Sequence, residues 1–236
     1  LWRTDKVKPA PDSWGVVFDK NSPYKGKVTA YDDPIYIADA ALYLSKTQPD
    51  LKITNPYELD QTQFDAAVAL LKKQRPLIGE YWSDYTKSQA AFTQGDIVLG
   101  TTWQVITNLL QADKDAMAKT PIASVIPDEG ATGWADTTMM HVDAANPNCA
   151  YLWMEHSISP KVQGDLAAWF GSVPAVPAAC KGNALLTDAG CDTNGMPNFD
   201  KIHFWRTPVT KCESQPAGCV PYYRWVSDYI GVIGGR

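Results

Sequence analysis

The sequence predicts an α/β fold with a largely parallel sheet, because short apolar strands alternate with helical patterns along much of the chain. Residues 27–31 and 97–101 have strand composition, and a helical pattern follows each. A chain of 236 residues is long enough for two lobes of ordinary domain size. In such sheets ligands bind beyond the carboxyl ends of the strands, so residues at those ends are the first candidates for a site.

Start and stop signals define most of the helices. After the strand at 27–31, Asp33 suits an N-cap and Pro34 suits the first helical position, which predicts a helix over 35–44. Further helices are expected over 61–73, 84–93 (stopping at Gly95), 105–117, 148–157, 161–170 and 220–230. Further strands are expected over 123–126 and 137–142, and an irregular connection over 173–198.

The composition argues against nucleic acid as a partner. The 26 acidic residues outnumber the 21 basic ones and give a net charge of −5, whereas phosphate binding needs clustered Lys and Arg. No apolar run is long enough to cross a bilayer, and no signal peptide opens the chain. The start at Leu1, without methionine, leads us to expect a processed, trimmed or partial chain.

Signals for catalysis and for metal binding are poor. The sequence lacks the nucleophile elbow of hydrolases, the Walker phosphate loop and the HExxH zinc motif. Its three histidines are scattered and have no recognisable nucleophile beside them. We therefore expect no enzyme activity, no cofactor and no metal site.

Five cysteines favour disulfides over free buried thiols, and hence an oxidising compartment. Cys212 and Cys219 bracket a turn-rich loop that could close as a small ring, and Cys180 and Cys191 bracket another short loop. Cys149 is an alternative partner for Cys180. One of the five cysteines must be left over or must pair with a sequence not present here.

The sequence Trp134-Ala135-Asp136 is a candidate receptor for an ammonium group. In an extended segment, residues two apart point to the same side, so the carboxylate and the indole would face one ligand. The acid would supply charge-assisted hydrogen bonds, and the ring would supply a cation–π attraction of roughly 0.5–2 kcal/mol. The alternative interpretation is a structural tryptophan followed by a capping aspartate.

For three other candidate ligand contacts, a purely structural role is an alternative interpretation. Trp103 follows a strand, where it is either a core residue or a cleft residue. Asp33 is an N-cap that could also face a cleft. Arg206 could bind a carboxylate in a bidentate manner or lie on the surface.

Several segments together resemble the periplasmic spermidine/putrescine-binding proteins of ABC importers. The resemblance depends on the order and spacing of the segments at 4–7, 11–14, 24–27, 95–103, 127–136 and 146–154, which include PDSW, GDIVLGTTW, PDEG, WAD and NPNCAYLWM. It implies two α/β lobes with a ligand trapped between them. The implied organisation is a second lobe over 1–131, a hinge crossing over 132–136, the C-terminal part of the first lobe over 137–202, and a segment over 203–236 that returns to pack on the second lobe.

The resemblance also implies that the opening stretch of the family pattern, which builds most of the first lobe, is missing here. Any membrane anchor would lie in that stretch. An exported or periplasmic monomer that delivers its ligand to a membrane permease is the implied biology. Some ligand contacts would then be absent from this sequence.

Position by position, the resemblance assigns ligand contacts to Asp33, Trp103, Trp134 and Asp136. It also assigns ligand contacts to three positions that depart from the polyamine binders, because this chain has Tyr36 in place of a glutamate, Ser172 in place of a tyrosine and Arg206 in place of a glutamine. Losing an acid and gaining an arginine disfavours a long dication. We therefore expect a shorter amine ligand, either putrescine or γ-aminobutyrate.

Two readings from other classes remain open on the sequence alone. Cleft tryptophans with paired carboxylates also suit a secreted glycoside hydrolase, in which Asp33 and Asp136 would be the acid and the base. A carbohydrate-binding protein without catalysis is the other reading.

Overall fold

The computed structural model describes residues 1–94 and 96–235, and divides the chain into two compact units. Unit 1 comprises Leu1–Gly133 and Lys201–Arg236, and unit 2 comprises Trp134–Asp200. The chain therefore leaves unit 1 after Gly133, within the expected crossing at 132–136, and re-enters it at Lys201. The role of this crossing as a hinge stays a prediction.

Unit 1 is built on a five-stranded sheet with the order β3-β2-β4-β1-β5. Its strands are β1 (Trp2–Arg3), β2 (Val28–Tyr31), β3 (Ile78–Trp82), β4 (Leu99–Gly100) and β5 (Ile122–Ala123). β2 pairs in parallel with β3 and β4, whereas β1 is antiparallel to β4 and β5. The sheet is thus mixed, with two parallel and two antiparallel pairings, whereas a largely parallel sheet was predicted. Only β1 runs in the opposite direction to the other strands of this sheet.

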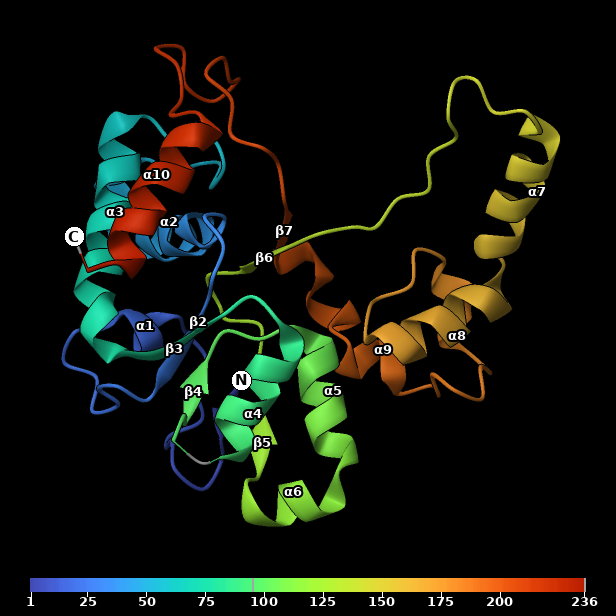
Figure 1. Ribbon diagram of the computed structural model, residues 1–236, viewed down its shortest axis with the longest axis horizontal. Helices are drawn as coiled ribbons and strands as arrows, with labels where there is room; N and C mark the ends of the chain where they lie inside the picture. The colour runs from blue at the N-terminus through green and yellow to red at the C-terminus, as the bar shows by residue number, and fades with distance from the viewer. Residues whose placement is uncertain (95, 236) are drawn as a thin grey trace. The chain divides into compact units, whose positions relative to one another are not determined.

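Helices cover both faces of this sheet. One core cluster joins β2 to α1 (Gly15–Phe18), α2 (Tyr36–Thr47), α3 (Gln61–Gln74) and α10 (Tyr222–Ile233), which lie together in Figure 1. The other cluster joins the sheet to α4 (Tyr85–Thr93) and α5 (Gln104–Ala112). Leu1, which directly precedes β1, belongs to the second cluster, and Trp2, the first residue of β1, belongs to the first.

The local signals placed most helices correctly. Asp60 caps α3 in a reciprocal capping box with Gln63, and Asp84 caps α4 by accepting from the amide of Thr86. The helix expected over 105–117 is instead two helices, α5 and α6 (Lys114–Lys119), because Asp113 ends the first and caps the second. Gly95, the expected stop of α4, lies outside the described residues.

A separate two-stranded parallel sheet carries the two chain connections of unit 1. β6 (Ala131–Gly133) precedes unit 2, and β7 (Ile202–Phe204) follows it. The residue pairs are Ala131↔Ile202, Thr132↔His203 and Gly133↔Phe204. The amide of Trp205 extends the pairing by donating to the carbonyl of Gly133 at 2.7 Å. We had not expected either strand.

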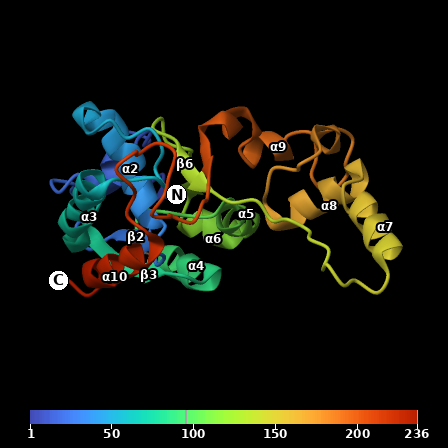
Figure 2. The same cartoon turned by 90° about the horizontal axis from the view of Figure 1, so that it is seen from above.

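Unit 2 is helical, with α7 (Pro147–Ser157), α8 (Pro160–Phe170) and the short α9 (Gly190–Thr193) (Figure 2). The connection at 173–198 is not wholly irregular, since it also holds 3₁₀ turns at Pro177–Cys180 and, at its end, Met196–Lys201. The expected strand over 137–142 is wrong. This stretch has no regular structure, and no strand of the described residues pairs with it.

Two disulfides close the loops proposed from the sequence. Cys180 bonds to Cys191 in unit 2, and Cys212 bonds to Cys219 in unit 1. Cys149 is the cysteine left over, and it is exposed. The second disulfide closes a loop that is also held by backbone bonds, from Cys219 to Thr210 and from Val220 to Leu59.

Unit 2 exposes many large apolar side chains to solvent and buries few. None of the residues of α7 is buried. Side chains at least 40% exposed are Met139, Val142, Tyr151, Leu152, Trp153, Ile158, Leu166, Trp169, Phe170, Leu185 and Phe199. The only core cluster of the described part of this unit is small and centres on Ala167, Leu186 and Cys191.

We expect these exposed rings to contribute little to stability within the 236-residue chain. Replacing Trp153 and Trp169, which are 65% and 78% exposed, with glutamine should change the free energy of unfolding by less than about 0.5 kcal/mol. The double variant should also self-associate less, because it removes exposed apolar surface. Urea titration and sedimentation velocity measure the two effects. The matched double change to phenylalanine should leave self-association in place, and a large loss of stability in the glutamine variant would contradict the expectation.

Candidate functional site

The carboxyl ends of β2, β3 and β4 share one edge of the sheet in unit 1. β2 ends at Tyr31, which pairs with Trp82 at the end of β3, and Asp32 and Asp33 follow directly. β4 ends at Gly100, and Trp103 lies three residues later at the start of α5. Parallel pairing therefore places Asp33 and Trp103 at the same edge, where this kind of sheet binds ligands.

Four aromatic rings gather at this edge, and we call them the aromatic cluster: Tyr31, Trp82, Trp103 and Trp205. The ring of Tyr31 lies 5.1 Å from Trp82, 5.5 Å from Trp103 and 6.2 Å from Trp205, measured between centroids. Trp82 and Trp103 meet edge to face at 5.1 Å. Trp82 is buried, whereas the other three rings are partly exposed. A ligand at this edge would thus contact the partly exposed rings of the aromatic cluster, while the ring of Trp82 stays buried.

Asp33 places a negative charge beside the aromatic cluster. Its Oδ1 accepts a hydrogen bond from the amide of Ile35 at 2.8 Å, so the side chain supports the first turn before α2 and is held in place. The side chain is partly exposed. Burial raises the pKa of Tyr31, and Asp33 raises it further. The pKa of Tyr222 is raised by the same two causes in the same order.

Tyr36 does not lie in a cleft, which corrects our expectation of a ligand contact there. Its side chain is 1% exposed within the main core, 6.0 Å from the ring of Phe18. Its hydroxyl accepts a hydrogen bond from Nε2 of Gln74 at 2.8 Å, and burial raises its pKa well above the usual value. The reason is its position at the start of α2, on the helix face that packs on the sheet.

Arg206 is exposed and lies close enough to Glu58 for their charges to interact. The pKa of Glu58 is lowered mainly by hydrogen bonds from Ser214, and the charge of Arg206 lowers it further. A carboxylate of unit 1 thus already offsets part of the arginine charge. The cost of an arginine near a bound ammonium is correspondingly smaller than the sequence alone suggested.

The other three expected contacts belong to unit 2. Trp134 is 36% exposed and Asp136 is exposed, both at the start of a segment without regular structure. Ser172 follows α8, is partly exposed, and accepts a hydrogen bond from Nδ2 of Asn194 at its backbone carbonyl. Whether these residues meet Asp33 and Trp103 around one ligand stays a prediction.

Sequence reasoning placed Tyr31 at a candidate position and missed Trp205 as a candidate contact. Tyr31 is the last residue of β2, and Trp205 directly follows β7. The strand-end rule already pointed to Tyr31, because the strand over 27–31 was expected. Trp205 could not be found in this way, because β7 has three residues and its partner strand is 71 positions away in the pairing Ala131↔Ile202.

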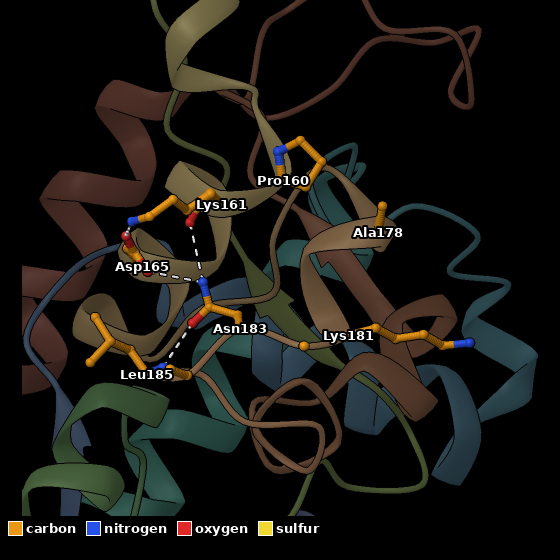
Figure 3. A pocket seen from close by; sticks show the side chains of 9 residues that line it. Pro160, Lys161, Asp165, Ala178, Lys181, Asn183 and Leu185 are labelled. Atoms are coloured by element: carbon orange, nitrogen blue, oxygen red, sulfur yellow. Dashed lines mark hydrogen bonds and ion pairs between the residues drawn. The ribbon is translucent and has the colours of Figure 1, made fainter.

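Two surface hollows are lined by none of the candidate contacts. One, of about 470 Å³, lies in unit 2 against α8 and the loop closed by the disulfide of Cys180 (Figure 3). Its polar groups bond to one another: Asn183 donates to Oδ1 of Asp165 at 2.9 Å, and Lys161 pairs with the same carboxylate at 2.6 Å. The second hollow, of about 450 Å³, lies in unit 1 beside Gln63 and Gln215. The network in the first hollow fixes the loop on α8 and leaves few groups for a ligand.

Residues 1–94 and 96–235 contain no group of three or more His, Cys, Asp or Glu side chains that could hold a metal ion. No helix in the same part of the chain is long and apolar enough to span a membrane.

Sequence comparison identifies a family and two curated relatives. The family model described as bacterial extracellular solute-binding protein matches residues 1–189. A putrescine/cadaverine-binding protein of Pseudomonas aeruginosa is 28% identical over 177 residues, covering 71% of this chain and 46% of the relative. The putrescine-binding periplasmic protein SpuD of the same species is 28% identical over 174 residues, covering 70% and 45%. The chain thus spans about half the length of these relatives.

Solved structures confirm the fold class. The substrate-binding protein PotD of a spermidine/putrescine ABC transporter from Streptococcus pneumoniae aligns with a TM-score of 0.61 at 16% identity, covering 98% of this chain and 63% of that one. The Tp0655 (TpPotD) lipoprotein of Treponema pallidum aligns with a TM-score of 0.62 at 14% identity, covering 98% and 64%. The fold is therefore the two-lobe α/β fold of binding proteins, with one lobe incomplete in these 236 residues.

Proposed function

Because the chain belongs to the bacterial extracellular solute-binding protein family, we propose that it is the substrate-binding receptor of an ABC importer and captures a short diamine of the putrescine class. The observation that carries this proposal is the placement of Asp33 beside the aromatic cluster at the carboxyl edge of the sheet in unit 1. The names of the curated relatives and of the similar structures support the same ligand class.

The chemistry of this edge suits one ammonium group. A carboxylate offers charge-assisted hydrogen bonds, and each accessible ring face of Tyr31, Trp103 or Trp205 offers a cation–π contact of roughly 0.5–2 kcal/mol. Asp33 needs little reorganisation to bind, because the amide of Ile35 already fixes it. The methylene chain of the ligand would lie on the same ring faces.

The second ammonium would bind Trp134 and Asp136 of unit 2, with Ser172 as a nearby polar group. This step requires the two units to close on the ligand, with the strands β6 and β7 as the hinge. Binding energy from both ends would then shift the balance between open and closed states. We leave Tyr36 out of the proposed site, because its side chain is buried in the core of unit 1.

A short diamine fits the charge inventory better than a longer polyamine. Among the proposed contacts only Asp33 and Asp136 are acids, so a third ammonium would lack a partner. Arg206, which is exposed and lies near Glu58, directly follows Trp205 and is a positive charge rather than a further acceptor. γ-Aminobutyrate would use Arg206 for its carboxylate, and it serves as the competing ligand in the test below.

The proposed biology is that of an exported protein that delivers its ligand to a membrane permease. The family description, the named periplasmic relative and the two disulfides support an oxidising compartment. Glycoside hydrolysis and sugar binding are not part of the proposal, because the similar proteins are named for polyamines.

Titration calorimetry of the 236-residue chain with putrescine, spermidine and γ-aminobutyrate tests the proposal. We expect putrescine to bind most tightly of the three and to raise the melting temperature. Tighter binding of γ-aminobutyrate would overturn the diamine assignment and favour a role for Arg206 in carboxylate binding. If none of the three ligands binds, the proposal that this chain is an amine receptor is wrong.

Replacing Asp33 with asparagine should weaken putrescine binding by roughly 10- to 100-fold, because the change removes a charge-assisted bond and leaves a neutral one. Asparagine keeps the ability to accept from the amide of Ile35, so the melting temperature should change little. The matched control is Asp113→Asn, which makes the same change at the cap of α6, at the far end of α5 from Trp103. Equal affinities of the two variants would contradict a role for Asp33.

A further inference from the structure

The strands β6 and β7 are held to unit 1 by two buried side chains. Asp39 on α2 accepts two hydrogen bonds from Thr132 of β6: Oδ1 from the backbone amide and Oδ2 from the hydroxyl, both at 3.1 Å. Tyr57 donates from its hydroxyl to the carbonyl of His203 of β7 at 2.6 Å. Asp39 is 7% exposed and Tyr57 is 2% exposed. Each strand therefore has its own polar anchor in the core of unit 1.

Burying the carboxyl group of Asp39 costs free energy, which its hydrogen bonds must offset. No ion pair of residues 1–94 and 96–235 includes it, and both of its oxygens are engaged by Thr132. A buried carboxylate without a cation is expensive unless its hydrogen bonds fix something that an apolar side chain could not. Here they fix a three-residue strand that pairs only with β7 in the described sheets.

The chain reaches Trp134 directly after β6, so the anchor of Thr132 lies two residues before the first proposed ligand contact of unit 2. We propose that Asp39 is a positioning residue, which fixes β6 through Thr132 and so sets the start of the ligand-binding segment 134–136. The assignment of ligand contacts in this segment rests on the proposed function, whereas the anchoring of β6 does not. Asp39 itself would not touch the ligand.

The titration of Asp39 gives this anchor a distinctive signature. Burial raises the pKa of Asp39 to about 7, and the bonds from Thr132 act in the opposite direction. The titratable groups around it are Tyr36 and Tyr57, on which its charge acts, and His203, which pairs with Thr132. Burial lowers the pKa of His203 and the charge of Lys46 lowers it further, so His203 favours the neutral form.

The sign of the pH dependence follows from linkage. When β6 detaches, Asp39 meets water and its pKa returns toward 3.8, whereas it is about 7 in the anchored state. The anchored state therefore binds the extra proton between these values. Raising the pH from roughly 4 to 7 should favour detachment, by at most about tenfold per pH unit, and the effect should level off above 7.

Hydrogen exchange of the amide of Thr132 in the 236-residue chain tests the proposal without any ligand. Asp39→Ala should speed exchange at this amide on the order of 10-fold, because the change removes the buried acceptor of the Thr132 amide. Asp39→Asn, which can accept from the amide and donate to the hydroxyl, should retain most of the protection but lose the pH dependence beyond the intrinsic rate. The amide of Thr86, which donates to Oδ1 of Asp84 at 2.8 Å, is the internal control and should not change.

A second variant keeps the test decisive if Asp39→Ala does not fold. Thr132→Val keeps the branched shape of the strand residue and removes only the hydroxyl bond, and should speed exchange at residue 132 by roughly 3- to 10-fold. Unchanged exchange in this variant, or a pH dependence that persists in Asp39→Asn, would overturn the proposal. A wild-type chain that shows these exchange effects but does not bind putrescine would overturn the proposed function and leave the anchor in place.

Discussion

Replacing Trp225 with alanine is expected to destabilise the protein by about 3–5 kcal/mol, the range for a fully buried tryptophan. The side chain is 0% exposed and lies 5.7 Å from the ring of Phe64 on α3. Its Nε1–H donates to the carbonyl of Val220 at 3.0 Å, so the truncation also leaves a buried carbonyl without this donor. Since Trp225 fastens α10 to unit 1, its loss should free the end of the returning segment.

Urea unfolding followed by circular dichroism measures this effect. The matched control is Tyr223→Ala, two positions earlier on α10, where the side chain is 71% exposed. The control should change the free energy of unfolding by less than about 0.5 kcal/mol. Similar losses in the two variants would mean that α10 does not pack on α3 through Trp225.

Elements that depend on neighbours in sequence could be predicted, and elements that depend on distant partners could not. The capping residues Asp60 and Asp84 sit one position before the helices that they start, and their signals are local. β1 is two residues long and pairs with Leu99 and Ala123, far along the chain. Strands of this length carry no period of their own, so only the tertiary fold reveals them.

The strand expected over 137–142 failed for the converse reason. Its residues have strand composition, and Met139 and Val142 are apolar, but they are 86% and 91% exposed. A strand needs a partner for its backbone groups, and none of the described strands pairs with this stretch. Composition alone cannot say whether a partner is present.

The candidate site also contains residues that the sequence predicted and one that it placed wrongly. Asp33 and Trp103 could be predicted because they follow strands that the sequence revealed, and the parallel pairing brings both to one edge. Tyr36 was assigned by its alignment with a family position, whereas the first turn of α2 points that side chain into the core. The period of the helix, rather than the alignment, decided its direction.

Under the proposed function, unit 1 supplies the contacts for one ammonium group as well as both anchors of its connecting strands. Asp33 and the aromatic cluster occupy one edge of the sheet, and Asp39 and Tyr57 fix β6 and β7 from the α2–α3 side. This arrangement would let unit 1 bind one end of a ligand while the strands set the direction from which the other contacts approach. The contacts from unit 2 therefore test the proposed function more strictly than the contacts from unit 1.

Replacing Asp136 with alanine should weaken putrescine binding by roughly 30-fold or more, because truncating one partner of a desolvated charge pair costs on the order of 2–5 kcal/mol. The free protein should keep its stability, because Asp136 is exposed in a segment without regular structure. Calorimetry gives the affinity and thermal unfolding gives the stability.

Asp143→Ala, which removes an exposed acid from the same segment, is the matched control and should bind putrescine like the wild type. If Asp136→Ala and the control bind equally well, the second ammonium has another partner and the closure of unit 2 through this segment is wrong. If only Asp136→Ala loses affinity while both proteins unfold at the same temperature, the loss belongs to the ligand contact, because a general disturbance of the segment would affect both variants.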